Sequence, residues 1–254
     1  MLIAEIFSSL QGEGLLTGTP SVFVRASGCN LRCWFCDTPY TSWQPEGEDW
    51  SVEAVVEEVE RLASRPLLSE AASSDTTGAA QGPIRQVGPT RHVVITGGEP
   101  MLFAEMIPLC RRLKELGFHI TVETAGTLFL PVECDLMSIS PKLANSTPSL
   151  EQAGKWAARH EQTRHQPEVI ARLIRDYEYQ LKFVVDSSAD LAEVHDWLDH
   201  FPLADRSRAL LMPQGTEPTA LAALQQWLEP YCRDRGFVFC PRKHIEWFGA
   251  RRGT

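Results

Sequence analysis

The 254-residue sequence has no long apolar run and no extended basic stretch. No segment approaches the roughly 20 apolar residues that a membrane-spanning helix requires, so we expect no membrane association. Lysine and arginine gather only in short pairs such as Arg111–Arg112 and Arg251–Arg252, and the net charge is −9. Because this balance disfavours a broad phosphate-binding surface, we expect no nucleic-acid partner.

The sequence also lacks the features of a secreted protein. The first residues, MLIAEIFSSL, have no basic flank and carry Glu5 within their apolar stretch, which argues against a signal peptide. Seven cysteines without a leader argue against a disulfide framework and favour the reducing cytoplasm. With 43% hydrophobic residues, the chain can form one large core. We expect a single domain over residues 1–254, with polar insertions near 64–91 and 145–166.

Three of the seven cysteines, Cys29, Cys33 and Cys36, lie close together in the segment CNLRCWFC. A closed zinc site takes four protein ligands, and iron–sulfur clusters are normally held by four cysteines. A thioredoxin-like CxxC motif would leave Cys29 without a role. The other four cysteines are isolated, so the spacing favours a 4Fe–4S cluster that keeps one iron open to another ligand.

Short apolar runs alternate with helical patterns along the chain. The expected strands are Ser21–Val24, Val93–Ile95, Ile120–Val122, Leu136–Ile139, Leu181–Val185, Leu210–Met212 and Phe237–Phe239. Helices are expected after the candidate caps Ser51 and Ser188, after Thr216 and Pro218, over Leu102–Leu116 before Gly117, and from Pro167. This alternation predicts an α/β fold with a mainly parallel sheet, whose functional residues lie in loops at the carboxyl ends of strands.

Three loops in such positions contain ligand-binding candidates. In Thr96–Pro100, TGGEP, a pair of glycines lets the backbone approach a ligand, and Glu99 offers an acceptor for an ammonium group; an ordinary strand-to-helix turn is the alternative. Ser140-Pro141-Lys142 supplies a hydroxyl and an ammonium for a cofactor ribose or carboxylate, unless Lys142 is a surface lysine. Met212-Pro213-Gln214-Gly215 repeats the arrangement or is a plain turn.

The N-terminal third adds candidates for substrate and metal binding. Gln11 and Glu13, in LQGEG, match the donors and acceptors of a pterin or guanine edge. Arg25 either binds a substrate carboxylate through two parallel hydrogen bonds or forms a structural ion pair. Thr38 is either a cap or turn hydroxyl or a ligand to Mg²⁺. Phe35 either stacks near an adenine or shields the cluster.

Six segments together resemble the 7-carboxy-7-deazaguanine synthase family of radical S-adenosylmethionine (SAM) enzymes. They are EIFSSLQGEG, FVRASGCNLRCWFCDTPYT, TGGEP, ETAG, SPK and HIEWFGARRGT. The resemblance implies a partial, distorted (βα) barrel and a homodimeric lyase. Its reaction would convert 6-carboxy-5,6,7,8-tetrahydropterin to 7-carboxy-7-deazaguanine with loss of ammonia. It would use a 4Fe–4S cluster, SAM that is regenerated, Mg²⁺ and an external one-electron donor, and no general-base histidine.

The resemblance also assigns roles residue by residue. Cys29, Cys33 and Cys36 would bind the cluster, and Thr38 would bind Mg²⁺. The cofactor residues would be Phe35, Asp37, Gly98, Glu99, Ser140, Pro141, Lys142, Met212, Pro213, Gln214 and Gly215. The substrate residues would be Leu10, Gln11, Gly12, Glu13, Arg25, Thr96 and Thr254. Two alternatives are another small radical SAM enzyme, such as a glycyl-radical activase, which gives no reason for LQGEG and Arg25, and a non-catalytic zinc-binding adaptor.

Overall fold

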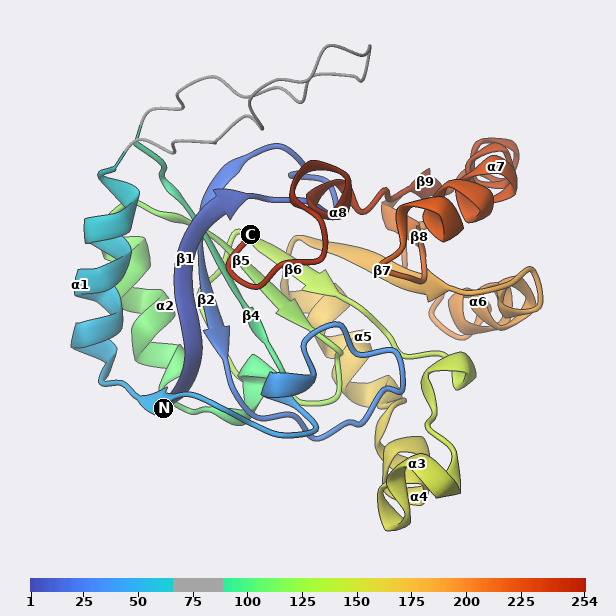
Figure 1. Cartoon of the computed structure of the whole chain (residues 1–254), viewed down its shortest axis with the longest axis horizontal. Helices are drawn as coiled ribbons and strands as arrows, with labels where there is room; N and C mark the ends of the chain where they lie inside the picture. Colours follow the sequence, from blue (N-terminus) through green and yellow to red (C-terminus); the bar gives the residue numbers. More distant parts are fainter. Residues whose placement is uncertain (66–88) are drawn as a thin grey trace.

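A mainly parallel sheet organises the molecule (Figure 1). The computed structural model describes residues 1–65 and 89–254, in which nine strands pair in the order β3-β1-β2-β4-β5-β6-β7-β8-β9. From β2 to β9 the neighbours run parallel, whereas β1 is antiparallel to both β2 and β3. The strands are β1 Leu2–Leu10, β2 Pro20–Ala26, β3 Glu48–Asp49, β4 His92–Gly97, β5 His119–Thr124, β6 Leu136–Ile139, β7 Tyr179–Val185, β8 Ala209–Pro213 and β9 Val238–Phe239.

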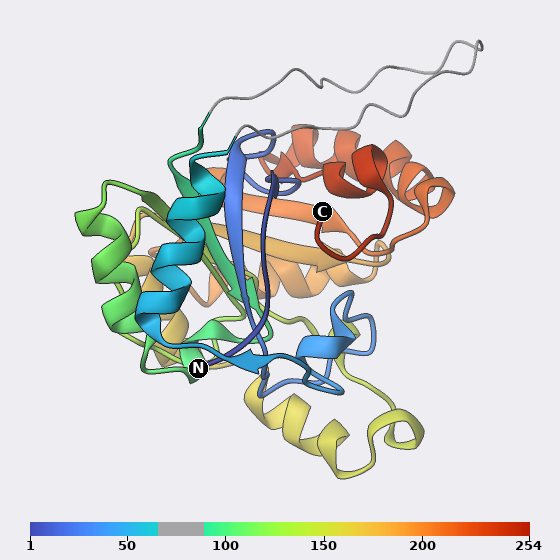
Figure 2. The ribbon, with the colours of Figure 1, turned by 60° about the vertical axis from the view of Figure 1, so that its left-hand side comes forward.

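The order is open, with β3 and β9 at its two edges, so the sheet is a partial barrel, as expected. Figures 1 and 2 show α1, α2 and α5 to α7 along the outside of the curved sheet, while α8 and the C-terminus lie across its open side. The helices are α1 Val52–Ala63, α2 Met106–Glu115, α3 Leu150–Ala153, α4 Lys155–Thr163, α5 Pro167–Asp176, α6 Asp190–Asp199, α7 Pro218–Arg235 and α8 Lys243–Phe248. None of the helices in the described residues is long and apolar enough to cross a bilayer.

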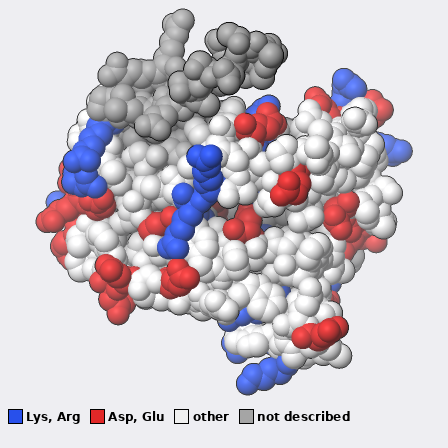
Figure 3. Space-filling model, in the orientation of Figure 1, with Lys and Arg blue, Asp and Glu red and all other residues white. Residues whose placement is uncertain are grey.

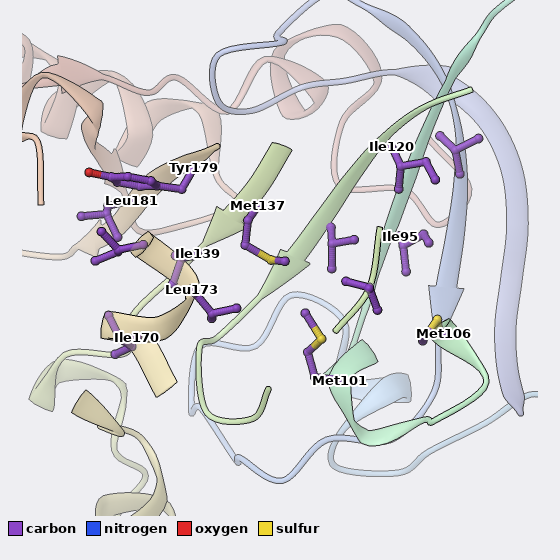
Figure 4. Packing of buried hydrophobic residues seen from close by; sticks show 14 of the residues in the cluster. Ile95, Met101, Met106, Ile120, Met137, Ile139, Ile170, Leu173, Tyr179 and Leu181 are labelled. Atoms are coloured by element: carbon purple, nitrogen blue, oxygen red, sulfur yellow. The ribbon is translucent and has the colours of Figure 1, made fainter. Parts of the chain in front are cut away.

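The core forms between the sheet and these outer helices. In β7 every residue is buried, as expected for a parallel strand covered on both faces. Apolar side chains from β4 to β7 meet those of α2 and α5, including Ile95, Met106, Met137 and Ile170 (Figure 4). This packing holds the carboxyl ends of the parallel strands side by side, where the candidate ligand-binding loops begin.

Only some of the helix starts agree with the sequence prediction. Ser51 caps α1 as expected, since its side chain accepts a hydrogen bond from Ala54 N at 3.1 Å. Leu102 does not belong to α2: it ends the 3₁₀ turn Pro100–Leu102, and α2 begins only at Met106. Ser188 does not cap α6: Ala189 stands at the N-cap position, without a side-chain cap bond. The Asp190 carboxylate in the first turn instead accepts from Asp186 N and Ser187 N, which precede the helix.

The later helices agree with the prediction only in part. The helix α7 begins at Pro218, in agreement with the expected pattern, and Glu217 stands at its cap position without a side-chain cap bond. The polar stretch 145–166 is largely helical, and the capping box of Ser149 and Gln152 begins α3. Burial of His160 anchors α4 to the domain.

The first strand, β1, was not among the expected strands; it pairs with β2 along its length.

The insertion predicted near 64–91 falls mostly on residues 66–88, which lie outside the described residues. The single domain over residues 1–254 therefore stays a prediction. Within the described residues, one continuous sheet connects the N-terminal strand to β9.

Candidate active site at the carboxyl ends of the strands

A cavity of about 510 Å³ opens where the parallel strands end. Its lining comes from β2, β4, β5, β6, β7 and β8, from the loop after β2, and from the last five residues of the chain. Most of the predicted site residues line it: Leu10, Gln11, Gly12, Glu13, Arg25, Cys29, Cys33, Phe35, Cys36, Asp37, Thr38, Thr96, Gly98, Ser140, Lys142, Met212, Gln214, Gly215 and Thr254. Glu99, Pro141 and Pro213 are not part of the lining.

Parallel register explains why residues far apart in sequence meet here. Arg25 of β2 lies opposite Thr96 of β4. Thr96 donates a hydrogen bond to Glu123 of β5 at 2.7 Å. Because the carboxyl ends of parallel strands share one edge, each of these side chains faces the same opening.

The three clustered cysteines all line this cavity, on what we call the cluster loop, residues 27–42. Among the described residues, no three Cys, His, Asp or Glu side chains are placed to hold one metal ion together, so the three thiols do not form a single-ion site. A 4Fe–4S cluster needs no such site, because each thiolate binds a different iron. Three thiols around one cavity therefore fit a cluster.

The cluster loop is held by backbone and side-chain contacts. The Trp43 indole donates to Cys33 O at 3.0 Å, and Cys36 Sγ lies 3.3 Å from Ser42 Oγ. Burial raises the pKa of the Cys29 thiol to about 12 and that of Cys33 to about 11. Since metal ligands are thiolates, binding a cluster here would displace protons from these thiols.

The glycine pair after β4 packs directly on the cluster loop. A Cβ on Gly98 would lie 2.1 Å from Gly28 O, and Gly97 has φ of +127° with Ala26 O 2.0 Å from a built Cβ. The backbone here is also hydrogen-bonded to β2 and to this loop, since Gly98 N donates to Ala26 O at 3.0 Å and Glu99 N donates to Gly28 O at 2.9 Å. Glycine is needed here because no side chain fits between the two backbones.

The Glu99 carboxylate, expected to accept from an ammonium group of a ligand, already has partners within the protein. The Glu99 side chain is fully buried, and its carboxylate accepts hydrogen bonds from Met101 N at 3.1 Å, Thr124 Oγ1 at 2.8 Å and Ala125 N at 2.9 Å. The carboxylate therefore ties the turn after β4 to the end of β5, and it lies beneath the cavity rather than in it. In this turn Pro100 occupies the first helical position, as expected for the strand-to-helix turn that was the alternative to a ligand-binding loop.

The other cofactor candidates border the cavity on adjacent loops. Lys142 donates to Ser140 Oγ at 2.7 Å, so the pair stays together at the end of β6. Gln214 N donates to Val185 O at 2.8 Å, which extends the β7–β8 pairing to the edge of the site. Pro141 and Pro213 shape these loops without lining the cavity.

Buried charges form a network on the substrate side, and sequence reasoning found only Glu13 among them. Lys182 Nζ lies 2.6 Å from Glu13 and 3.7 Å from Glu123. Burial alone would raise the pKa of Glu13, but the charges of Lys182 and Arg242 outweigh it and hold this pKa well below its usual value. Glu13 is therefore ionised at neutral pH. Burial would lower the pKa of Lys182, but Glu13 and Glu123 raise it above its usual value, so Lys182 stays charged.

Arg242 connects three parts of the site. Its Nε donates to Glu13 at 3.0 Å, and one terminal nitrogen donates to Gly215 O at 2.6 Å. The other forms an ion pair with Asp37, the residue after Cys36. The guanidinium thus joins the LQGEG loop, the loop after β8 and the cluster loop. A lone arginine near the C-terminus carries no sequence signal for this role.

Arg25 and Thr38 both line the cavity and also make contacts within the protein. Arg25 Nε donates to Glu5 at 2.7 Å, so the structural ion pair exists, and Arg25 also lines the cavity. Glu5 accepts a second hydrogen bond from the Tyr40 hydroxyl at 2.8 Å. The Thr38 hydroxyl lines the cavity and accepts from Thr41 Oγ1 at 3.3 Å. It does not cap the turn Pro39–Thr41.

The last residues of the chain close one side of the cavity. Arg252 lies 3.3 Å from Glu5 and stacks over the Tyr40 ring at 4.2 Å. Thr254 Oγ1 donates to Arg251 O at 2.9 Å and lines the cavity, as predicted for a substrate-side residue. The terminal segment is thereby attached to β1 and to the cluster loop.

This combination, three thiols beside a glycine turn at the carboxyl ends of a partial parallel barrel, defines a class of cluster-dependent enzyme. The profile of the Radical SAM superfamily matches residues 23–145, which contain the cluster loop and the TGGEP turn. The structure is also similar to the crystal structure of QueE from Escherichia coli, with a TM-score of 0.65 and 23% identity over 96% of this chain and 94% of that one. That similarity supports the fold.

The similar sequences define the family. A 7-carboxy-7-deazaguanine synthase from Rhodopirellula baltica is 43% identical over 100% of this chain and 89% of the relative. Another, from Halobacterium salinarum, is 41% identical over 96% of this chain and 88% of the relative. The chain belongs to the 7-carboxy-7-deazaguanine synthase family of the radical SAM superfamily. Membership makes it a radical SAM lyase whose cofactors are a 4Fe–4S cluster and SAM.

Proposed function

We propose that this chain converts 6-carboxy-5,6,7,8-tetrahydropterin to 7-carboxy-7-deazaguanine with release of ammonia. The main support for this proposal is that one cavity is lined both by the three cluster thiols and by the buried charges around the LQGEG loop. The two relatives described above are named as this synthase, and the chain aligns with nearly their whole length. A glycyl-radical activase gives no reason for this polar substrate side.

The substrate side offers groups for each end of such a pterin. Arg25 uses Nε for Glu5, and its terminal nitrogens are suited to a substrate carboxylate. The amide of Gln11 donates to Glu123 at 3.4 Å, and its oxygen accepts from Glu13 N at 3.2 Å. Each carboxylate oxygen has a further lone pair. Gln11, Glu13 and Glu123 together present acceptors to the amino and ring N–H groups of a pterin.

The cofactor side orients SAM against the substrate. When bound, the cluster and SAM supply the one-electron chemistry that removes a hydrogen from the substrate carbon bearing the carboxylate, and SAM is regenerated. Cys29, Cys33 and Cys36 hold the cluster, while Gly98, Ser140 and Lys142 border the space beside it. The chain positions both molecules and limits the access of water, so no histidine is required as a general base.

Thr38 would hold Mg²⁺ between protein and substrate. Mg²⁺ is usually bound by one or two protein ligands and keeps several waters or substrate oxygens, and Thr38 supplies one hydroxyl to the cavity beside Cys36. Thr38→Ala should therefore weaken the Mg²⁺ dependence of turnover, whereas Thr38→Ser should retain it. Equal Mg²⁺ response in the two variants would remove Thr38 from the metal site.

The remaining proposals concern partners and location. We propose a homodimer in the cytoplasm that receives one electron from an external donor. The sequence resemblance to the synthase family implies these features. On the face seen in Figure 3, acidic and basic side chains are interspersed. Light scattering of the reconstituted protein measures the oligomeric state; a monomer would contradict the dimer.

The activity test uses the whole chain after anaerobic reconstitution with iron and sulfide. Incubation with the tetrahydropterin, SAM, Mg²⁺ and a chemical reductant should yield 7-carboxy-7-deazaguanine, identified by mass spectrometry. In Arg25→Lys we expect kcat/KM for the pterin to fall roughly tenfold or more, since a charge-assisted hydrogen bond contributes about 1.5–3 kcal/mol. Slow SAM cleavage without substrate should be unchanged. No product from a fully loaded enzyme would exclude this substrate.

A further inference from the structure

The helix α4 and the turn before α3 lie against the cluster loop (Figures 1 and 2). Trp34, between Cys33 and Cys36, donates through its indole to Asn145 O at 2.7 Å and through its backbone to Ser146 O at 3.2 Å. The Arg32 guanidinium stacks on the ring of Trp156 at 4.1 Å. The stretch expected to be a polar insertion is thus a support for the segment that contains the cysteines.

The deepest of these contacts comes from His160. Its side chain is fully buried in α4, and its Nδ1 accepts a hydrogen bond from Arg32 N at 3.0 Å. Its Nε2 lies 3.0 Å from Ser146 Oγ, and Ser146 in turn donates to Leu143 O at 2.6 Å. This network assigns the ring proton to Nε2, because Nδ1 must accept and the Ser146 proton is already used.

The charge state of the ring is consistent with this assignment. Burial lowers the pKa of His160 to about 4, so the imidazole is neutral at pH 7 and keeps the free lone pair on Nδ1 that the contact with Arg32 needs.

The contact between His160 and Arg32 lies next to the cluster cysteines. Arg32 immediately precedes Cys33, and its guanidinium donates to Cys29 O at 2.9 Å and to Leu31 O at 2.7 Å. The arginine side chain therefore stabilises the turn between the first two cysteines by bonds within the loop. The His160 imidazole, from α4, accepts a hydrogen bond from the backbone of the same arginine. Together they restrict the peptide that sets the direction of the Cys33 side chain.

We propose that His160 is a positioning residue that preorganises the cluster loop through the Arg32 amide and so slows loss of the 4Fe–4S cluster. His160 does not line the cavity, so its effect passes through the loop and does not depend on the identity of the substrate. An unsatisfied buried N–H favours opening of the turn, which would expose the cluster to solvent and oxygen.

Two substitutions separate the two nitrogens of this ring. The Asn side chain places its oxygen near the position of Nδ1, so His160→Asn keeps the acceptor for Arg32. The longer Gln side chain reaches the position of Nε2, so His160→Gln keeps only the contact with Ser146. Both remove the ring and should lower the unfolding temperature of the cluster-free protein, and His160→Gln should lower it further because it leaves the Arg32 N–H unsatisfied.

The measurement is the iron content after anaerobic reconstitution, followed by the decay of the visible iron–sulfide absorbance under a fixed concentration of chelator. We expect His160→Asn to lose its cluster at nearly the wild-type rate and His160→Gln roughly tenfold faster, the factor expected for one unsatisfied buried donor. The same two changes at His165, whose ring packs edge-on to Phe201 at 6.1 Å, serve as controls and should leave the decay unchanged.

Equal rates in the two His160 variants, whether slow or fast, would overturn the proposal, as would a similar acceleration in the His165→Gln control. If neither variant folds, Ser146→Ala keeps the ring but removes the group that fixes its tautomer. Faster cluster loss in Ser146→Ala would support the proposal, and an unchanged rate would overturn it.

Discussion

Replacing Lys182 with Met should be strongly destabilising because it removes a charge from a buried network. Lys182 Nζ lies 2.6 Å from Glu13, with side-chain exposures of 6% and 14%. Removing one partner of a buried ion pair typically costs about 3–5 kcal/mol, because the other charge remains buried. Arg242 still contacts Glu13 at 3.0 Å, so we expect the lower end, about 3 kcal/mol.

The chain contains a matched control for burial. Lys114 Nζ is also 2.6 Å from its partner, Asp135, but these side chains are 34% and 30% exposed. Exposed pairs contribute about 0–1 kcal/mol, so Lys114→Met should cost less than about 1 kcal/mol. The two variants therefore differ in burial at equal distance.

Urea unfolding of the cluster-free protein, without oxygen and with reductant, measures both free energies. The Lys182→Met variant should also unfold roughly 6–12 °C below the wild type, since 1 kcal/mol corresponds to about 2–4 °C in a chain of this size. If Lys182→Met costs no more than Lys114→Met, burial does not determine the strength of this ion pair, and the description of the substrate side is wrong.

The same pair predicts a pH dependence. The pKa of Glu13 is lowered from 4.5, so its contribution is complete above pH 4.5 and is lost as the pH falls toward the lowered value. The pKa of Lys182 is raised from 10.5, so its contribution is complete below pH 10.5 and is lost above it. The stability difference between wild type and Lys182→Met should be largest between these limits; a difference that stays constant down to pH 2 would contradict the assignment.

Three further predictions test the cluster loop, the glycine turn and a helix cap. Cys33→Ala should abolish the visible iron–sulfide absorbance, whereas Cys110→Ala should retain it; loss in the latter would reveal a fourth protein ligand. Gly98→Ala should weaken SAM binding more than tenfold in calorimetric titration, because the added Cβ would lie 2.1 Å from Gly28 O and displace the loop; unchanged affinity would show that the turn does not position SAM. Ser51→Ala should lower the free energy of unfolding by about 1 kcal/mol through loss of the cap on α1, measured in urea, and no change would mean that the bond to Ala54 contributes nothing.

Much of the architecture was predictable because local patterns determine it. Short apolar runs between turn residues located seven of the nine strands of the described residues, all of them in the parallel part of the sheet. The missed strand β1 carries polar and apolar residues without strict alternation, and its pairing with β2 shifts register between Ile3 and Glu5. A pattern of period two is weak in such a strand.

The site was predictable where a residue type has few other uses. Three close cysteines and a glycine pair after a strand have strong requirements of chemistry or space, and the structure brings both to one cavity. Glu99 shows the limit of this reasoning. Its role toward a ligand stays a prediction, whereas three donors from its own surroundings bond its carboxylate in the structure, and sequence alone does not show which donors lie nearest.

By itself, the sequence determined the order of strands and helices, the cluster-binding segment and the family. These depend on spacing within a few residues and on motifs with a single chemical use. Only the tertiary structure placed Lys182 and Arg242 at the cavity and His160 against the cluster loop, because each contacts a residue more than 100 positions away. Contacts of that range are set by the register of the parallel sheet and by the packing of α4 and the chain end on its open side, and an isolated charged or imidazole side chain carries no local sign of the partner it will meet.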